Sequence, residues 1–96
     1  NYGLYLDNCS SNIRRCHIQN NQGVGIVLVN GSSPNLGSLE DYGYNFIGNN
    51  DSDNYQLSNN SGNSVSAIGN YWQWNNPITI DEHIFIISKK LKVLID

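Results

Sequence analysis

The sequence predicts an all-β fold, a solenoid of parallel strands that makes about three turns over residues 1–74 and ends in a short helix and a strand over residues 75–96. The chain of 96 residues holds seventeen Asn, eleven Ser and nine Gly, which favour turns, and only 14% charged residues. Its short segments alternate between apolar and polar residues, as strands do. Similar segments also recur a full repeat apart, so like residues are predicted to stack on like.

The first two turns, at about residues 3–22 and 25–50, begin with the same segment. Residues 3–11 match residues 25–33, twenty-two positions later, in a Gly, two aliphatic residues, an Asn and a Ser-Ser pair. A match of this length at a fixed spacing indicates stacked copies of one structural unit.

A second series of matching segments locates an insertion. Residues 17–21 match residues 46–50, twenty-nine positions later, which is longer than the first spacing. One additional loop of about seven residues, at 37–43, explains the difference.

The third turn, at about residues 54–71, is predicted from the segments 55–61 and 67–71, the latter twenty-one positions after 46–50. Stacking the copies gives three rows of inward side chains for the core. The predicted rows are Leu4 with Ile26 and Tyr55, Leu6 with Leu28 and Leu57, and Ile18 with Ile47 and Ile68.

An asparagine closes each of these segments. Asn tolerates the left-handed backbone region and hydrogen-bonds within its own turn. The repeats therefore predict two stacked asparagine ladders, one of Asn8, Asn30 and Asn59, the other of Asn20, Asn49 and Asn70. Amides stack without the repulsion of like charges, which explains why so few charged residues are present.

The repeat stops after Pro77. Thr79-Ile80-Asp81-Glu82 has the pattern of a capping box with acidic residues in a first helical turn. A helix is therefore predicted at about residues 80–87, followed by a strand at about 91–95. Because the end of a solenoid exposes its core, this segment is predicted to be a C-terminal cap.

Charge and hydropathy argue against two classes of partner. Five Lys+Arg against eight Asp+Glu give a formal net charge of -3, so no basic patch for nucleic acid is expected. The longest apolar run, residues 84–87, is far shorter than the roughly 18 residues of a membrane span. The chain opens on Asn1 inside a strand pattern, so upstream turns of the same polypeptide are an expected partner.

The repeat resembles that of a known family. The pattern Gly-aliphatic-x-aliphatic-x-Asn followed by Ser-Ser, and then x-Ile-x-Asn-Asn, is similar to the right-handed parallel β-helix repeat of pectate-lyase-like proteins, over residues 3 to about 71. Residues 43–50 and 68–72 look like the last turns of many secreted bacterial members, which commonly have Gly where Gln73 stands here. The resemblance implies a right-handed, single-stranded β-helix and an extracellular or cell-surface location, with the periplasm as the alternative.

The resemblance also directs attention to Arg14-Arg15, because β-helix lyases use an Arg base beside Asp-bound calcium. No acidic ladder on the adjacent turns accompanies this pair, so no catalytic residue is assigned. Asp51-Ser52-Asp53-Asn54 begins like a calcium loop, but Gln56 and Gly62 stand where such a loop has Gly and Glu. A solvated turn is the preferred interpretation, so no cofactor or metal is expected, with calcium as the alternative.

Other reactive side chains are isolated in the sequence. Glu40-Asp41 lies on the inserted loop without a positioned partner, and His17 and His83 lack the spacing of a metal site. Cys9 and Cys16 fit no zinc motif, and the sequence leaves open whether they pair.

Aromatic residues are the best binding candidates. Tyr71, Trp72 and Trp74 lie together, and sugar rings stack on flat aromatic faces. The alternative is that the two tryptophans cover the last turn beneath the cap. Tyr5 and Tyr42 are further exposed candidates.

The predicted function is that of a non-catalytic β-helix module of a secreted or cell-surface protein, either structural and adhesive or carbohydrate-binding, with a polysaccharide or cell-surface glycan as partner. One alternative is the C-terminal part of a β-helix polysaccharide lyase, hydrolase or epimerase whose active site lies upstream. Another is a periplasmic maturation factor for a metalloenzyme. Because Leu4 and Leu6 of the first turn are left uncovered, the chain is expected to be marginally stable or to associate end to end.

Overall fold

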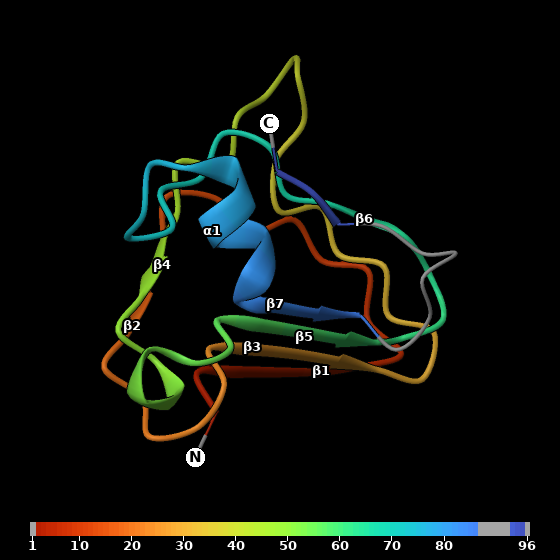
Figure 1. Ribbon diagram of the computed structural model, residues 1–96. Helices are drawn as coiled ribbons and strands as arrows, with labels where there is room; N and C mark the ends of the chain where they lie inside the picture. The colour runs from red at the N-terminus through yellow and green to blue at the C-terminus, as the bar shows by residue number, and fades with distance from the viewer. Residues whose placement is uncertain (1, 87–92, 96) are drawn as a thin grey trace.

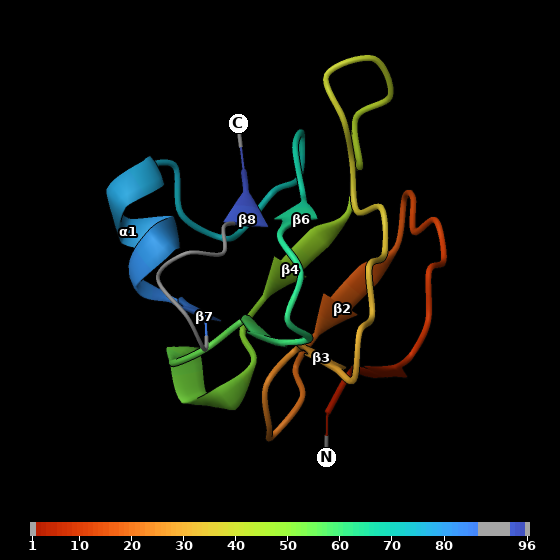
Figure 2. The same cartoon turned by 90° about the vertical axis from the view of Figure 1, so that its right-hand side faces the viewer.

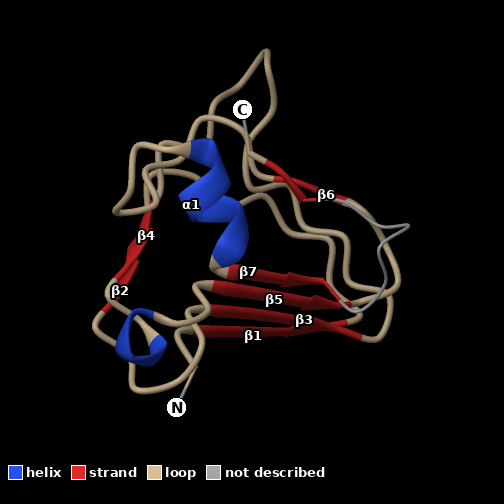
Figure 3. Cartoon of the chain, viewed as in Figure 1, coloured by secondary structure: helices blue, strands red, loops and turns tan. Residues whose placement is uncertain are grey.

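The computed structural model describes residues 2–86 and 93–95, which form short parallel strands in three small sheets, together with one short α-helix (Figures 1 and 3). The all-β class predicted from the sequence is therefore correct. The four-stranded sheet holds β1 (Leu4–Asp7), β3 (Ile26–Val29), β5 (Leu57–Asn60) and β7 (Ile84–Ile86), in that spatial order. The two-stranded sheets hold β2 (His17–Gln19) with β4 (Phe46–Gly48), and β6 (Val65–Ser66) with β8 (Val93–Leu94).

Every strand pair among the described residues is parallel. The pairs β1–β3, β2–β4 and β3–β5 join equivalent segments of the repeat, whereas β7 and β8 pair with it from the C-terminal segment. We call the stretches that begin with β1, β3 and β5 the first, second and third pass. Isolated bridges link Asn12 to Asn35 and Asn35 to Ser66 of β6. The backbone is therefore paired across all three passes on the side of the molecule that carries β6 as well. Another bridge, from Phe46 to Tyr71, extends the β2–β4 side into the third pass.

The core lies between the three sheets. In β1 the half-buried Leu4 and Leu6 alternate with exposed residues, which is the period of a strand with one buried face. The buried cluster consists of Ile18, Ile26, Leu28, Leu36, Ile47, Leu57, Val65, Ala67, Trp72, Ile80 and Ile84. Figure 2 shows helix α1 (Pro77–Glu82) at one end of the molecule and the first pass, in red and orange, at the other.

The predicted rows hold between the first and second passes and shift in the third. The pairs in register as predicted are Leu4 with Ile26, Leu6 with Leu28, and Ile18 with Ile47. Leu57 lies beside Ile26 in place of Tyr55, and Asn59 lies beside Leu28. The cause is the 3-10 turn η1 (Asp51–Asp53), which lengthens the connection from β4 to β5 relative to that from β2 to β3.

The inserted loop lies where the sequence predicts it. The separation of paired residues rises from 23 for Asn12 and Asn35 to 29 for His17 and Phe46. Residues 37–43 therefore form an additional loop in the second pass, which projects at the top of Figure 1 in yellow.

The third pass lacks this loop, and the register of the β2–β4 side changes accordingly. Phe46 is bridged to Tyr71, so the row that contains Ile47 continues to the buried Trp72, and the predicted position of Ile68 in that row is wrong. A repeat of aliphatic, Gly and Asn at residues 68–70 suggested the wrong alignment.

The turn positions of the predicted asparagine ladders correspond between the first two passes only. Asn8 and Asn30 directly follow the paired residues Asp7 and Val29, and Asn20 and Asn49 follow Gln19 and Gly48; all four have positive φ between 52° and 62°. The registers of β5 and of Tyr71 take Asn59 and Asn70 out of these ladders, and both have other partners.

The C-terminal helix begins earlier than predicted. The side chain of Asn76 accepts a hydrogen bond from Ile78 N–H at 2.9 Å, and Pro77 occupies the first helical position, where its missing N–H costs nothing. Thr79, the predicted cap, therefore lies inside the helix.

The predicted helix at 80–87 is correspondingly wrong beyond Glu82. Residues 84–86 form β7, because pairing with β5 satisfies their backbone groups at the edge of the four-stranded sheet. Residue 87 of the predicted helix and residues 91–92 of the predicted strand lie outside the described residues, whereas Val93 and Leu94 form β8.

Candidate functional site

The β2–β4 side carries an outward column of aromatic rings. The rings of His17 and Phe46 have centroids 6.0 Å apart, and those of Phe46 and Tyr71 are 5.1 Å apart. Parallel register places one ring of this column on each pass. The column spans all three passes, and Tyr71 remains 52% exposed at its last position.

A second outward column runs beside the first. The guanidinium carbon of Arg15 lies 5.5 Å from the centroid of the Tyr44 ring, in a cation–π contact. Tyr44 N–H in turn donates a hydrogen bond to the Gly69 carbonyl at 2.9 Å. The column therefore holds a cation on the first pass, an exposed aromatic ring on the second and no side chain on the third.

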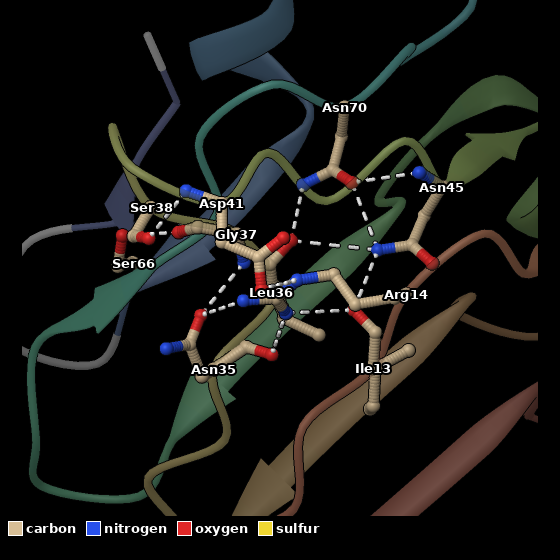
Figure 4. Close-up of polar contacts among 10 residues, drawn as sticks. All are labelled: Ile13, Arg14, Asn35, Leu36, Gly37, Ser38, Asp41, Asn45, Ser66 and Asn70. Atoms are coloured by element: carbon tan, nitrogen blue, oxygen red, sulfur yellow. Dashed lines mark hydrogen bonds and ion pairs between the residues drawn. The ribbon is translucent and has the colours of Figure 1, made fainter.

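Between these two columns lies a column of amides. Asn45, which is 1% exposed, accepts a hydrogen bond from Cys16 N–H at 2.9 Å through its Oδ1. Its Nδ2 donates to Asn70 Oδ1 at 2.9 Å and to the Ile13 carbonyl at 3.1 Å (Figure 4). The sequence did not predict this pairing, because Asn45 precedes the repeated segment and Asn70 was assigned to another ladder.

Asn70 is bonded just as completely. Its Nδ2 donates to the carbonyls of Leu36 and Ala67, both at 2.9 Å, and its Oδ1 also accepts the Asn45 backbone N–H at 3.0 Å. Both amide groups are thus held in one orientation by partners on adjacent passes. They fix the backbone from which the two outward columns project.

A hollow of about 270 Å³ opens between the columns, and we call it the aromatic groove. The residues that line it are Tyr44, Asn45, Phe46, Gly69, Asn70 and Tyr71. Gly69 has a φ of +78°, and a Cβ atom there would lie only 2.5 Å from Cβ and Cγ of Tyr42. A side chain at position 69 would thus be strained and would collide with Tyr42.

The groove offers aromatic surface and little free hydrogen-bonding capacity at its floor. Both amide donors of Asn45 and of Asn70 are already used within the protein. Polar contacts to a ligand therefore fall to Tyr44 and Tyr71, which are 59% and 52% exposed. No lining residue is charged.

The two adjacent arginines have different environments. The Arg14 side chain is 15% exposed and donates to the Asn35 carbonyl at 2.7 Å, to Asn35 Oδ1 at 2.9 Å and to Asp41 Oδ2 at 3.2 Å. It anchors the inserted loop to the first pass and is not free to act as a base. Arg15, by contrast, makes no ion pair with any described residue.

Of the three predicted binding residues, only Tyr71 lies at the aromatic groove. Trp72 is 1% exposed in the core, and its Nε1 has no hydrogen-bond partner among the described residues, so its place as a ligand-binding candidate is wrong. The Trp74 ring is stacked on His83 with centroids 4.0 Å apart and an interplanar angle of 20°, so one of its faces is occupied.

Sequence reasoning missed Tyr44 and Phe46. Their signal was available as two aromatic residues two positions apart at the start of a repeated segment. The earlier match of residues 46–50 to 17–21 already placed Phe46 beside His17, but only the bridge to Tyr71 joins the groove across two passes.

The remaining candidates do not come together as a site in the described part of the chain. No three His, Cys, Asp or Glu residues are grouped so as to hold a metal ion there. Cys9 and Cys16 are free thiols. No helix among the described residues is long and apolar enough to cross a membrane.

Comparison with known proteins adds no family. No protein-family model, curated protein or solved structure matches this chain.

Proposed function

We propose that this chain is a section of a right-handed parallel β-helix that serves as a non-catalytic module of a secreted or cell-surface protein and binds carbohydrate in the aromatic groove. The β-helix is supported by strand pairs that join equivalent segments of successive passes, all of them parallel. Connections between parallel strands of one sheet are right-handed in about 98% of cases. The link from β1 to β3 is a connection of this type.

The single observation that carries the binding proposal is the groove between Tyr44 and the Phe46–Tyr71 pair. The apolar CH face of a sugar packs on an aromatic ring, and its hydroxyl groups reach the polar tips of tyrosines. The hollow of about 270 Å³ is near the lower end of the roughly 300–1,000 Å³ range of small-molecule pockets, which suits a small ligand.

The amide column supports binding in a second way. Asn45 and Asn70 fix the backbone on either side of the groove through bonds at 2.9 Å to 3.1 Å. A site that is already ordered loses less conformational entropy when it binds. The exposed aromatic rings are thus presented on a rigid surface.

Affinity gel electrophoresis over a panel of immobilised glycans tests this proposal. The chain is expected to be retarded by at least one glycan, and Tyr44→Ala and Tyr71→Ala should each abolish the retardation. Tyr5→Ala is the matched control, since Tyr5 is 55% exposed but projects from the four-stranded sheet. Absence of retardation on the whole panel, or an equal loss in Tyr5→Ala, would overturn the assignment of the groove.

A further inference from the structure

We infer that the N-terminal face of the molecule, meaning the side of the first pass that points away from the second, is a docking surface for one further parallel pass of the same polypeptide. The docked pass carries an Asn or Gln directly above Asn21. This face lies at the opposite end of the molecule from α1 (Figure 2). It has three distinctive features: incompletely covered core residues, an unpaired strand edge and a column of amides that ends on an open acceptor.

The core residues of the first pass are covered less completely than those of the second. Leu4 and Leu6 are half-buried, whereas their partners in register, Ile26 and Leu28, are 0% exposed. A hollow of about 370 Å³ is lined by first-pass residues alone, Leu4 among them. The first pass covers the second, and no described residue covers the first in the same way. An added pass would therefore bury apolar surface that is now partly exposed.

The backbone of β1 forms an unpaired edge of the four-stranded sheet. Leu4 N–H donates to the Gly25 carbonyl at 2.8 Å, which directs the backbone groups of Leu4 toward the second pass. Because the backbone groups of a parallel strand point alternately to its two sides, those of Tyr5 and Asp7 point away from β3. β1 is the outermost strand of its sheet, so these groups pair with no strand among the described residues. An extended segment alongside β1 would complete the ladder.

A second column of amides ends at the N-terminal face and indicates the chemistry of the partner. Gln56 Oε1 accepts hydrogen bonds from the backbone N–H of Asn50 at 3.0 Å and from its Nδ2 at 2.9 Å. Asn50 Oδ1 accepts in the same way from the backbone N–H of Asn21 at 3.1 Å and from its Nδ2 at 2.9 Å. Asn21 Oδ1 is the next acceptor of the series, and no described residue donates to it. A residue stacked above Asn21 completes the pattern if it offers a backbone N–H and a side-chain amide, which Asn and Gln do.

The direction of this column argues against a second copy of the chain as the partner. Each side-chain oxygen accepts from the pass before it, so the N-terminal face presents an acceptor and requires a donor. Two such faces turned toward each other would bring two Asn21 oxygens together with no amide donor for either. The other end of the column is Gln56, which is 0% exposed and so cannot donate to a neighbouring molecule.

The position of Asn21 suits a pass that belongs to the same polypeptide. Asn21 lies beside Gly3, where an added Cβ would be 2.8 Å from Asn21 Nδ2, and Asn50 lies beside Gly25, where an added Cβ would be 2.6 Å from Asn50 Nδ2. Residues 22–24 are enough to lead from Asn21 to Gly25 one pass further on. An amide residue stacked above Asn21 stands in the same relation to Gly3, so an equally short connection joins the added pass to β1.

Joining a second copy of residues 1–22 ahead of Asn1 tests the inference, since this extension supplies one more pass with an asparagine in register with Asn21. The Tyr5 and Asp7 amides of the original first pass should then exchange with deuterium about tenfold or more slowly, because they become hydrogen-bonded within a sheet. The midpoint of urea unfolding should also rise. One control extension holds the same residues in scrambled order, and another carries Asn21→Ala in the added copy. Exchange at Ile47, which is 0% exposed, verifies that the original chain stays folded.

Each outcome supports or overturns a stated part of the inference. Protection of the two amides by the ordered extension but not by the scrambled one supports the docking surface, and equal exchange in the extended and unextended chains overturns it. A smaller rise of the midpoint with Asn21→Ala in the added copy supports the amide position, and an equal rise overturns it. Sedimentation of the unextended chain as a dimer with both amides already protected overturns the added pass in favour of a second copy. The aromatic groove lies on the second and third passes, so its glycan binding is tested separately.

Discussion

Replacing Asn45 with alanine removes the side chain that joins the first, second and third passes on the β2–β4 side. Three well-placed hydrogen bonds are lost, from Cys16 N–H at 2.9 Å, to the Ile13 carbonyl at 3.1 Å and to Asn70 Oδ1 at 2.9 Å. Each is worth about 1 kcal/mol net, and a partner left buried and unpaired costs about 1–3 kcal/mol. We expect Asn45→Ala to lower the free energy of unfolding by about 3–4 kcal/mol, a large share of the roughly 5–15 kcal/mol of a small domain.

Urea unfolding measures this loss, with the fluorescence of the buried Trp72 as the signal. At a slope of about 1–3 kcal/mol/M, the unfolding midpoint should fall by roughly 1–4 M. Asn54→Ala is the control, because Asn54 is exposed and surface substitutions usually stay within about 0.5 kcal/mol. A loss below about 1 kcal/mol in Asn45→Ala would refute the argument that the amide column organises this side.

Three further substitutions test other parts of the structure. Gly69→Ala should destabilise the fold by clearly more than Gly31→Ala in thermal melts: both positions have a φ of +78°, but only at Gly69 does the added Cβ meet an aromatic side chain; equal losses would show that the steric contact is relieved. Arg14→Lys should lower the free energy of unfolding by about 1–3 kcal/mol, because an ammonium cannot reproduce the two-pronged hydrogen bonding of the guanidinium. Asp41→Asn should lower it by less than about 1 kcal/mol, since that carboxylate is 65% exposed. Chemical unfolding measures both losses, and a larger loss in Asp41→Asn would contradict this reasoning. Trp72→Ala should cost about 3–5 kcal/mol by leaving a core cavity, and Trp72→Phe much less, because it retains an aromatic ring and removes an unpaired indole N–H; a comparable loss in both would mean that the indole is bonded.

The local features of the fold could be predicted from the sequence. Alternation of apolar and polar residues marked β1 and β2, and the match of residues 3–11 to 25–33 gave the correct register of β1 with β3. Parallel pairing followed because similar segments lay a full repeat apart. The inserted loop was predicted because its effect on spacing was visible within one pair of passes.

Register in the third pass could not be predicted in the same way. The placement of a strand depends on the summed length of every connection before it, and η1 lengthens one of these connections without a clear signal in the sequence. The resulting shift of two residues put Asn59 beside Leu28. A similar error assigned Ile68 to the position that Trp72 occupies.

The candidate site, too, could be predicted only in part from the sequence. Tyr71 was identified as an aromatic binding candidate by its neighbourhood in the sequence, but its groove partners Tyr44 and Phe46 lie on a different pass. The sequence also could not show which of the two adjacent arginines pairs with Asp41 and which lies over the Tyr44 ring. Residues of one type at neighbouring positions differ only in the contacts that they make in the folded chain.

The amino-acid sequence was enough to predict that the chain is all-β, that its strands are short and pair in parallel, and that asparagine occupies tight turns. These properties depend on side-chain chemistry and on spacings within a few residues or one repeat. The bonded column of Asn45 and Asn70 and the groove between Tyr44, Phe46 and Tyr71 became visible only in the folded chain. Each is built from residues of different passes, whose alignment is set by backbone pairing and core packing across the whole molecule.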